Sequence, residues 1–446
     1  MDVTFLEQFS SQYGWQVAPA KRRFRYRKEV NKGMRESHRL ALTMRGVIDR
    51  ALDDLEGLQA SDYSTYQIFE EGDLAFKLID LENIKTSRVG LVPRRGIMSP
   101  AYVRLIPNHR RADSRFYAWF FFAVYFNNIF NGMGGGVRQN LTPTDLLEFP
   151  IPLPDLATQR QIADFLDRET ARIDLLIEKK QRFIDVLSQK WAATVTSTLT
   201  NGLNRDAPTK KSGVSWIGDI PAHWNIAKLG HIGRSANGIN IGGDAFGSGY
   251  PFVSYSDVYR NTELPLTVNG LVQSSAEDRM RYTLKAGDVL FTRTSETIDE
   301  IGFSSVCIED MPEAVFAGFL IRFRPTKGKL APLFSKFLFR NERLRAFFSK
   351  EMMIVTRASL SQGLLQRMPV VLPPIEEQEQ IAKYLQRAQD TFLTVSQKTK
   401  ISINRLKEYR SALITAAVTG QIDVHSYAKS GTPDRRLDAI QEEMEA

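Results

Sequence analysis

The sequence predicts an α+β protein in which two tandem mixed α/β domains are separated and joined by two long antiparallel coiled-coil helices. A segment that begins "LPDLATQRQIADFL" (153–166) returns as "LPPIEEQEQIAKYL" (372–385), at the constant offset of 219 residues that separates Gln159 from Gln378. Both copies continue for about 45 residues with apolar side chains at spacings of three, four and seven, which indicates a helix with a coiled-coil seam. The chain is therefore interpreted as a tandem duplication.

The duplication extends upstream of the helices. "VRQNLTPTDLLEFPIPLP" (137–154) aligns without a gap with "TRASLSQGLLQRMPVVLP" (356–373). Further upstream the match is looser: "FEEGDLAF" (69–76) resembles "LKAGDVLF" (284–291), and the Gly-Asp pair of each predicts a turn before an apolar strand. Each half is therefore predicted to be a mixed domain of about 150 residues followed by a long helix.

Proline and polar stretches set the predicted boundaries. Pro154 and Pro373 push the preceding residues toward extended conformations and stop any helix that arrives from upstream. A polar stretch with Pro and Gly marks a linker between the copies. The predicted division is a first mixed domain at 1–152, a first helix at 153–202, a linker at 203–213, a second mixed domain at 214–371, a second helix at 372–424 and a loose tail with a short terminal helix at 425–446.

The repeating apolar stripe predicts the interface of the helix pair. Polar residues such as Lys180 and Thr399 interrupt the stripe, so neither helix is expected to be stable alone, and pairing with the other copy is the natural solution. The predicted interface residues are Leu166, Ile173, Ile177, Ile184, Leu187, Leu385, Phe392, Ile403, Leu406 and Leu413.

Composition narrows the function classes. The chain has 446 residues and a formal net charge of +8. The positive sign favours a polyanionic partner such as nucleic acid, although a merely basic soluble protein fits the charge equally well. Cys307 is the only cysteine, which excludes an intramolecular disulfide and a cysteine-rich zinc site. The five histidines lack metal-ligand spacing, so no metal site is predicted.

Neither the N-terminal residues nor the longest apolar run indicates secretion or a membrane span. The N-terminus begins with acidic and polar residues and shows no secretory signal. The longest apolar run, 116–126, is too short to span a bilayer and predicts a buried helix instead. A cytoplasmic protein is expected.

Motifs of catalysis are missing. The sequence contains no Gly-x-x-x-x-Gly-Lys, His-Glu-x-x-His, Gly-x-Ser-x-Gly or Gly-x-Gly-x-x-Gly motif, and no Asn-Pro-Pro-Tyr/Phe stretch of an adenine methyltransferase. The glycine-rich stretch 131–140 lacks the lysine and the strand–loop–helix setting of a phosphate loop, so a flexible loop is the preferred interpretation. No catalytic residue is predicted.

Basic clusters are the candidate nucleic-acid contacts. The segment 21–35 combines basic and aromatic residues, which suits phosphate contacts, with a solvated charged surface as the alternative. Arg293 falls on a loop directly after a Gly-Asp strand, where base-reading side chains tend to lie. Arg138 and Arg357 share one repeat position, which fits a phosphate contact or a structural salt bridge equally. The predicted DNA-binding residues are Lys21, Arg22, Arg23, Arg25, Arg138, Tyr255, Arg293 and Arg357.

Several stretches match the pattern of a known family. They are "IGDIPAHWNIAKL" (217–229), the Gly-Asp strands, the Leu-Pro…Gln-x-Gln-Ile-Ala helix starts and "LKEYRSALITAAVTGQIDV" (406–424). In this doubled order the chain resembles the specificity subunit of a bacterial type I restriction–modification system, over nearly its whole length. The first half departs from the pattern, because "SSQYGWQVAP" (10–19) replaces the Ile-Gly-x-Ile-Pro signature.

The resemblance implies a function. The mixed domains would be target-recognition domains, each reading one half of a bipartite, asymmetric site on double-stranded DNA, while the helix pair sets the spacer and docks two modification subunits. The chain would be a non-catalytic subunit of an adenine-N6 methyltransferase, which restriction subunits convert into an ATP-dependent nuclease. No cofactor is expected on this chain, and S-adenosylmethionine and ATP with Mg are expected on partner subunits.

Two alternatives remain open from the residues alone. One is an assembly scaffold whose helices organise partner proteins without reading DNA. The other is an enzyme whose active site follows none of the common motifs. A salt titration of DNA binding separates the first from a specificity subunit, because phosphate contacts release counterions and weaken as salt rises. Methyl transfer by the chain alone would establish the second.

Overall fold

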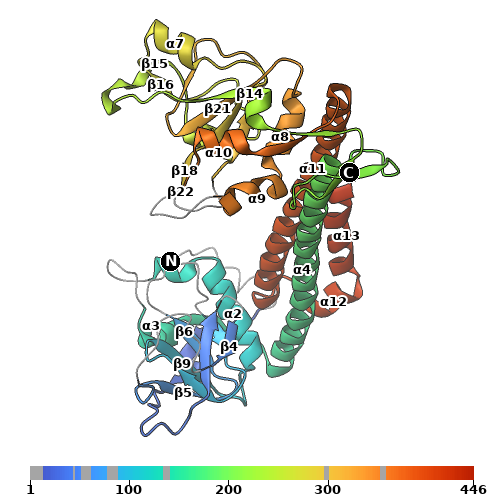
Figure 1. Ribbon diagram of the computed structural model, residues 1–446. Helices are drawn as coiled ribbons and strands as arrows, with labels where there is room; N and C mark the ends of the chain where they lie inside the picture. Colours follow the sequence, from blue (N-terminus) through green and yellow to red (C-terminus); the bar gives the residue numbers. More distant parts are fainter. Residues whose placement is uncertain are drawn as a thin grey trace. The chain divides into compact units, whose positions relative to one another are not determined.

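The structure of the chain is a computed structural model (Figure 1) that describes residues 14–43, 46–51, 62–77, 89–133, 141–295, 301–351 and 358–445. The chain folds into two compact units. Unit 1 comprises Met1–Arg182 together with Lys398–Ala446, and unit 2 comprises Phe183–Gln397. Each unit therefore contains one mixed α/β domain and a part of both long helices.

The mixed domain of unit 1 is built on two four-stranded sheets. The central sheet is antiparallel throughout, in the order β2 (Phe24–Tyr26), β9 (Tyr102–Pro107), β6 (Leu74–Lys77) and β7 (Val89–Leu91). The other sheet has the order β4 (Gly46–Arg50), β3 (Arg39–Thr43), β8 (Gly96–Met98) and β5 (Gln67–Phe69). The smaller elements are β1 (Val17–Pro19), which pairs with β10 (Pro150–Pro152), and the short helices η2 (Ala20–Arg22), η3 (Ile129–Gly132) and α3 (Pro143–Glu148).

Helix α2 (Ser114–Phe126) supplies most of the aromatic core of unit 1. The buried helix that the sequence predicts for this apolar run is confirmed, and its fully buried aromatic residues are Phe116, Tyr117, Phe120 and Phe121. Rings from the central sheet meet them edge to face, Phe24 on Tyr117 at 5.1 Å and Phe76 on Phe121 at 5.0 Å between centroids. Across the described ranges, no helix combines the length and the hydropathy needed to cross a membrane.

The mixed domain of unit 2 contains a central sheet of the same design. Its strands are all antiparallel and have the order β14 (Gly233–Asn237), β21 (Leu320–Pro325), β17 (Val289–Thr292) and β19 (Ser304–Val306). The second sheet differs from that of unit 1, because it has the three strands β16 (Leu271–Val272), β15 (Phe246–Val253) and β20 (Val315–Phe316).

Shorter elements complete unit 2. The two-stranded ladders pair β11 (Thr209–Lys211) with β12 (Asp219–Pro221), β13 (Asn225–Lys228) with β23 (Pro369–Leu372), and β18 (Thr294–Ser295) with β22 (Ala358–Ser359). The helices are α5 (Leu229–Ile232), η4 (Gly243–Ala245), α6 (Tyr255–Arg260), α7 (Ala276–Tyr282), α8 (Pro332–Arg340), α9 (Glu342–Glu351) and α10 (Gln362–Arg367). The predicted linker stretch thus contributes the strand β11.

Strand register shows that the two central sheets correspond. In unit 1, Leu74 of β6 lies opposite Leu105 of β9, and in unit 2 Val289 of β17 lies opposite Phe323 of β21. These strands follow the repeated Gly-Asp turns of the sequence, and each pair occupies the middle of its sheet. The duplication that the sequence predicts is therefore also a duplication of the sheet.

In both units the aspartate of the Gly-Asp turn pairs with an arginine of the neighbouring strand, although strand register aligns Arg104 with Arg322 and not with Arg324. Asp73 is buried, and its carboxylate accepts a hydrogen bond from the guanidinium of Arg104 on β9. Asp288 is buried as well, and it accepts two bonds from Arg324 on β21, at 2.7 and 2.6 Å. Burial raises the pKa of the Asp73 carboxyl, which the hydrogen bond from the backbone N–H of Glu70 and the Arg104 charge oppose. A buried carboxylate thus ties the start of one strand to its neighbour.

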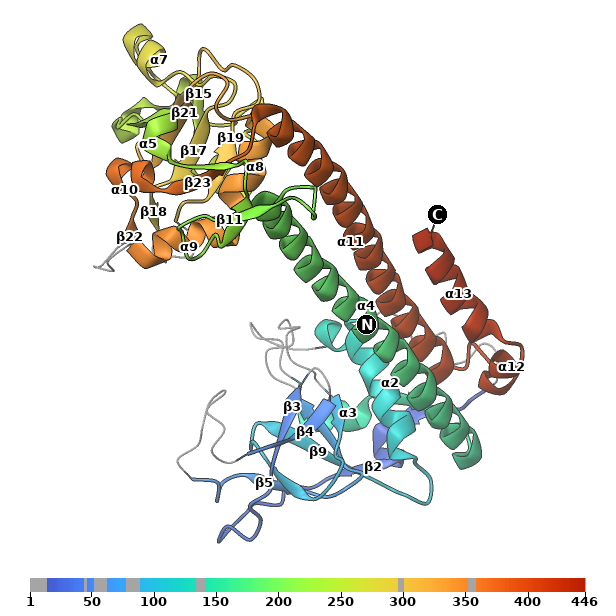
Figure 2. The same ribbon diagram turned by 45° about the vertical axis from the view of Figure 1, so that its right-hand side comes forward.

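Two long helices, α4 (Leu156–Asn201) of 46 residues and α11 (Ile375–Val418) of 44 residues, run through both units. In unit 1 the first part of α4 packs with the last part of α11, so that Leu166 and Leu413 share one core. In unit 2 the last part of α4 packs with the first part of α11, and Leu199 shares a core with Leu385. The two helices are therefore antiparallel (Figure 2), and the predicted fold class is confirmed.

The C-terminal segment differs from its prediction. The sequence predicts a loose tail with a short helix, whereas the structure forms α12 (Val424–Lys429) and α13 (Thr432–Glu445), both packed into unit 1. Leu437 of α13 is buried, and Tyr427 of α12 meets Phe165 of α4 edge-on, with 6.2 Å between ring centroids. The partner of these side chains is remote in sequence, so a local pattern could not show that they become buried.

Candidate nucleic-acid interface

The first glutamine of the Gln-x-Gln-Ile-Ala segment attaches the mixed domain of unit 1 to α4. Gln159 is fully buried, and its side-chain Oε1 accepts a hydrogen bond from the backbone N–H of Asp113 at 2.7 Å. Its Nε2 donates to the carbonyls of Pro154 at 2.8 Å and Arg111 at 3.2 Å. Because a buried amide without partners is costly, these bonds hold the base of α2 against the start of α4.

Unit 2 repeats this attachment. The Oε1 of the buried Gln378 accepts from the backbone N–H of Ala331 at 2.9 Å, and its Nε2 donates to the carbonyls of Pro373 at 2.9 Å and Lys329 at 3.2 Å. The repeated segment therefore positions the mixed domain on its helix and supplies no reactive group. It gives each mixed domain a rigid mounting, on which loops at the edge of the sheet can be held in place.

Four of the predicted basic residues of unit 1 lie on η2, on β2 and, for Arg23, between them, and β2 is an edge strand of the central sheet. Lys21 forms an ion pair with Glu148 at 2.6 Å, and Arg23 is half-buried, with its Nε buried and without a partner among the described residues. The exposed side chains of Arg22 and Arg25 have no ion-pair or hydrogen-bond partner within the described ranges. Arg22 and Arg25 are thus available for phosphates among the described residues, whereas Lys21 shares an exposed ion pair and Arg23 is half-buried.

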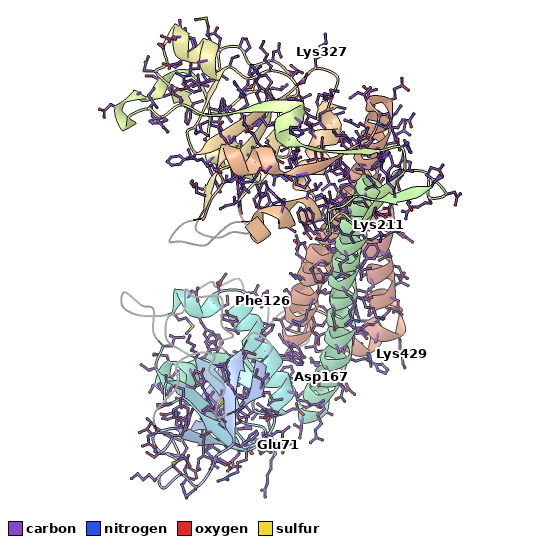
Figure 3. All side chains as sticks on the ribbon, viewed as in Figure 1. Glu71, Phe126, Asp167, Lys211, Lys327 and Lys429 are labelled. Carbon is purple, nitrogen blue, oxygen red and sulfur yellow. The ribbon has the colours of Figure 1, made fainter. Side chains whose placement is uncertain are left out.

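A cavity of about 350 Å³ opens beside β2. Its walls carry opposite charges, which are contributed by Arg25, Arg27, Arg104, Glu29, Glu70, Asp73 and by Glu71, labelled in Figure 3. A phosphate would meet carboxylates as well as guanidinium groups there, so the cavity does not favour an anion. The outer edge of β2 is the better candidate for phosphate contacts in unit 1.

In unit 2, Arg293 lies between β17 and β18, on the loop that the sequence predicts. Its backbone is held from both sides, because its N–H donates to the carbonyl of Phe319 at 3.0 Å and its carbonyl accepts from the N–H of Leu360 at 2.7 Å. The side-chain Nη1 makes a long contact of 3.5 Å with the carbonyl of Gly318, and Nε is buried without a partner in the described part of the chain. The guanidinium therefore sits on a loop that backbone hydrogen bonds fix, and no carboxylate of the described residues pairs with it.

Tyr255, the remaining predicted contact of unit 2, begins α6 and is half-buried. Its ring stacks on Tyr259 with 6.0 Å between centroids, and Tyr259 meets Phe303 edge-on at 5.0 Å. Arg340 lies 4.7 Å from the Phe303 centroid, and burial lowers its pKa to about 10. Its guanidinium donates to the carbonyls of Val258, Tyr259, Asn261 and Ser304. Arg340 is therefore a structural cation that holds the Tyr255 helix in place.

The other predicted residues fall into two groups. Arg138 and Arg357 lie outside the described residues, and the assignment of all eight residues to DNA contact stays a prediction. Within the predicted helix interface, the buried residues are Leu166, Ile173, Ile184, Leu385, Ile403, Leu406 and Leu413, and the half-buried ones are Ile177, Leu187 and Phe392.

Sequence reasoning missed two exposed side chains beside Arg293, those of Asn240 and Phe319. A signal for them exists in the neighbouring glycines, Gly238 and Gly318, which mark a close approach of two backbones. Across the described residues, no group of three or more His, Cys, Asp or Glu side chains is arranged to hold a metal ion.

Two copies of one α/β unit, mounted on a shared pair of antiparallel helices, define a class of duplicated two-domain proteins. Comparison with known families places the chain within this class. The family model described as "Type I restriction modification DNA specificity domain" matches residues 51–183 and 221–405, and the chain belongs to this family. Each match covers most of one mixed domain and part of the helix that follows it.

Several relatives carry the name of specificity subunits. The putative type I restriction enzyme MjaX specificity subunit of Methanocaldococcus jannaschii is 28% identical over 206 residues, which are 45% of this chain and 48% of that protein. The type I restriction enzyme EcoKI specificity subunit of Escherichia coli is 24% identical over 310 residues, which are 67% of this chain and 63% of that protein. The matches thus span from about half to just under two thirds of these relatives.

Solved structures share the fold. A chain from work on complex assembly and conformational transition of the type I R-M system has a TM-score of 0.67 at 17% identity, with 92% of this chain and 99% of that chain covered. The HsdS subunit of Thermoanaerobacter tengcongensis has a TM-score of 0.55 at 17% identity, with 92% and 98% covered. At this identity the likeness concerns the fold alone.

Proposed function

We propose that the chain is the DNA specificity subunit of a type I restriction–modification system, and that each of its two units reads one half of a bipartite, asymmetric DNA site. The observation that carries this proposal is that the two units share one framework but differ in the segments around it. Both units share the central sheet and the glutamine mounting, whereas their second sheets and edge loops differ. Two domains with the same scaffold and different surface segments are suited to recognise two different half-sites.

The chemistry would belong to partner subunits. The chain contributes recognition and assembly, two modification subunits contribute adenine-N6 methyl transfer with S-adenosylmethionine, and restriction subunits contribute ATP- and Mg-dependent cleavage. The complex would act on double-stranded DNA in the cytoplasm. The relatives named as specificity subunits of type I restriction enzymes support this assignment of partners.

The helix pair would set the length of the spacer between the half-sites and dock the modification subunits. At about 1.5 Å per residue, a helix such as α4 is about 65–70 Å long, which matches about two turns of DNA. Inserting about one heptad into one helix is expected to change the preferred spacer without changing the half-site sequences. A preferred spacer that stays the same after the insertion would contradict this role.

Adenine methylation mapped genome-wide, with and without the chain, tests the function. A methylated bipartite motif that appears only with the chain and its modification subunits is the expected result. Binding of the complex to that motif should weaken steeply as salt rises, because phosphate contacts release counterions. Salt-insensitive binding or none would favour an assembly scaffold, and methyl transfer by the chain alone would show an enzyme.

A further inference from the structure

We propose that Asn240, Arg293 and Phe319 form a base-reading cluster of unit 2, in which Phe319 makes an apolar contact with a base of the half-site that this unit reads. The cluster rests on the proposed function, since it names the side chains through which unit 2 would recognise DNA. Its members come from three different loops of the chain.

Sheet topology brings the three loops together. β14 and β17 both pair with β21, and both run antiparallel to it. The last residues of β14 and β17 therefore lie at the same end of the strands as the first residues of β21. Asn240 follows β14, Arg293 follows β17, and Phe319 directly precedes β21. All three residues therefore lie at one end of the central sheet.

Hydrogen bonds fix the turn that carries Phe319. The backbone N–H of Ala317 donates to the carbonyl of Val253, the last residue of β15, at 3.0 Å. The carbonyl of Phe319 itself accepts from the N–H of Arg293 at 3.0 Å, and the N–H of Leu320 closes the turn on Ala317 at 2.9 Å. The turn is therefore attached to two other segments, and the backbone that carries the phenyl ring is set before any ligand arrives.

Two glycines allow the loop of Asn240 to approach this turn. A Cβ on Gly318 would lie 1.9 Å from the side-chain Oδ1 of Asn240, and a Cβ on Gly238 would lie 2.1 Å from the carbonyl oxygen of Ala317. At Gly238 the obstacle is backbone, so no larger residue fits there, whereas a larger residue at Gly318 would displace the Asn240 side chain from its position. Glycine is commonly found where backbone must come close, and here its effect is to place the Asn240 amide beside the Phe319 turn.

The three side chains have the chemistry of base recognition, although Arg293 is half-buried. Phe319 is 65% exposed, although it is held on a rigid turn. A phenyl ring can pack against the methyl group of thymine or stack on a base. The guanidinium of Arg293 suits guanine, and the exposed amide of Asn240 suits adenine. Single exposed apolar residues are common on protein surfaces, but this one shares its end of the sheet with an amide and a guanidinium, the groups that suit base edges.

Unit 1 lacks the aromatic member. The equivalent turn precedes β9, since Tyr102 begins β9 opposite the end of β6, just as Leu320 begins β21 opposite the end of β17. The residue before Tyr102 is Ala101, at the position that corresponds to Phe319. The contact therefore belongs to unit 2 alone, and its removal should affect one half-site only.

The test uses the complete complex with its modification subunits and a duplex that carries the mapped methylation motif. Phe319→Ala is expected to weaken binding about five- to a hundredfold through one half-site, with the base preferences of the other half-site unchanged. The matched control is Leu266→Ala. Leu266 is 62% exposed and closely follows Leu264, whose N–H donates to the carbonyl of Val306 opposite the start of β17, whereas Arg293 follows the end of that strand. Binding by the control should equal that of the original chain.

Uracil in place of thymine separates two sources of the contact, because it removes only the methyl group. A loss of binding for the original chain and none for Phe319→Ala supports a methyl contact. A defect of Phe319→Ala that uracil does not reproduce supports stacking on a base. Unchanged affinity and unchanged half-site preference of Phe319→Ala would overturn the proposal. A complex of the original chain that methylates no bipartite motif would instead remove the proposed function, so the two failures are distinct.

Discussion

The glutamine mounting of unit 2 allows a quantitative test of how the mixed domain is held on its helix. Gln378→Leu keeps the approximate volume of the side chain but leaves the N–H of Ala331 and the carbonyls of Lys329 and Pro373 without this partner. Ala331 precedes α8 and has no side-chain cap of its own. A buried group that loses its partner costs about 1–3 kcal/mol, so three such groups, one of them weakly bonded, amount to about 4 kcal/mol.

Urea unfolding and thermal melting measure this loss. About 4 kcal/mol corresponds to a decrease in Tm of roughly 8–16 °C for a unit of this size. Gln380→Leu is the matched control, because Gln380 is the second glutamine of the same segment and is exposed, and a change within about 0.5 kcal/mol is expected for it. Equal destabilisation by the two variants would refute the role of the first glutamine.

Three further outcomes are expected. Burial raises the pKa of the Cys307 thiol to about 12, so at pH 8 iodoacetamide should modify it at least about a hundredfold more slowly in the folded protein than in urea, and equal rates would contradict this. Arg340→Lys should lower the stability of unit 2 by about 2–4 kcal/mol in thermal melts, because one ammonium group cannot reach four carbonyls, and a loss below about 1 kcal/mol would argue against its structural role. Tyr427→Ala should make the amide protons of α12 and α13 exchange about tenfold faster, because it removes the ring contact with Phe165. Unchanged exchange would show that this contact does not hold the two helices.

The features that could be predicted from the sequence are those with a strong local pattern. The heptad spacing around Leu166 and Leu385 identified both long helices, and the Gly-Asp pairs identified strands that the structure places in equivalent sheets. The apolar run 116–126 was long enough to indicate a buried helix. Repetition added information, because each pattern occurred twice in the same order.

The features that escaped prediction depend on contacts between distant parts of the chain. The basic cluster does not reveal the ion pair that Lys21 forms with Glu148, far away in sequence, and the DNA contact of Lys21 stays a prediction. Tyr427 lies in a polar tail, and its packing role depends on the ring contact with Phe165, which is remote in sequence. The position of Phe319 at the sheet edge follows from the antiparallel pairing of β21 with β17, which no local spacing reveals.

The shared helices also affect how the chain is made. Unit 1 consists of Met1–Arg182 and Lys398–Ala446, so its core lacks Leu406, Leu413 and Val418 until the last part of the chain has been synthesised. The 215 residues of unit 2, Phe183–Gln397, are translated in between. At typical elongation rates this takes roughly ten to forty seconds. During that interval the apolar face at the start of α4 is exposed on the nascent chain, and the domain that is translated first is the last one to complete its core.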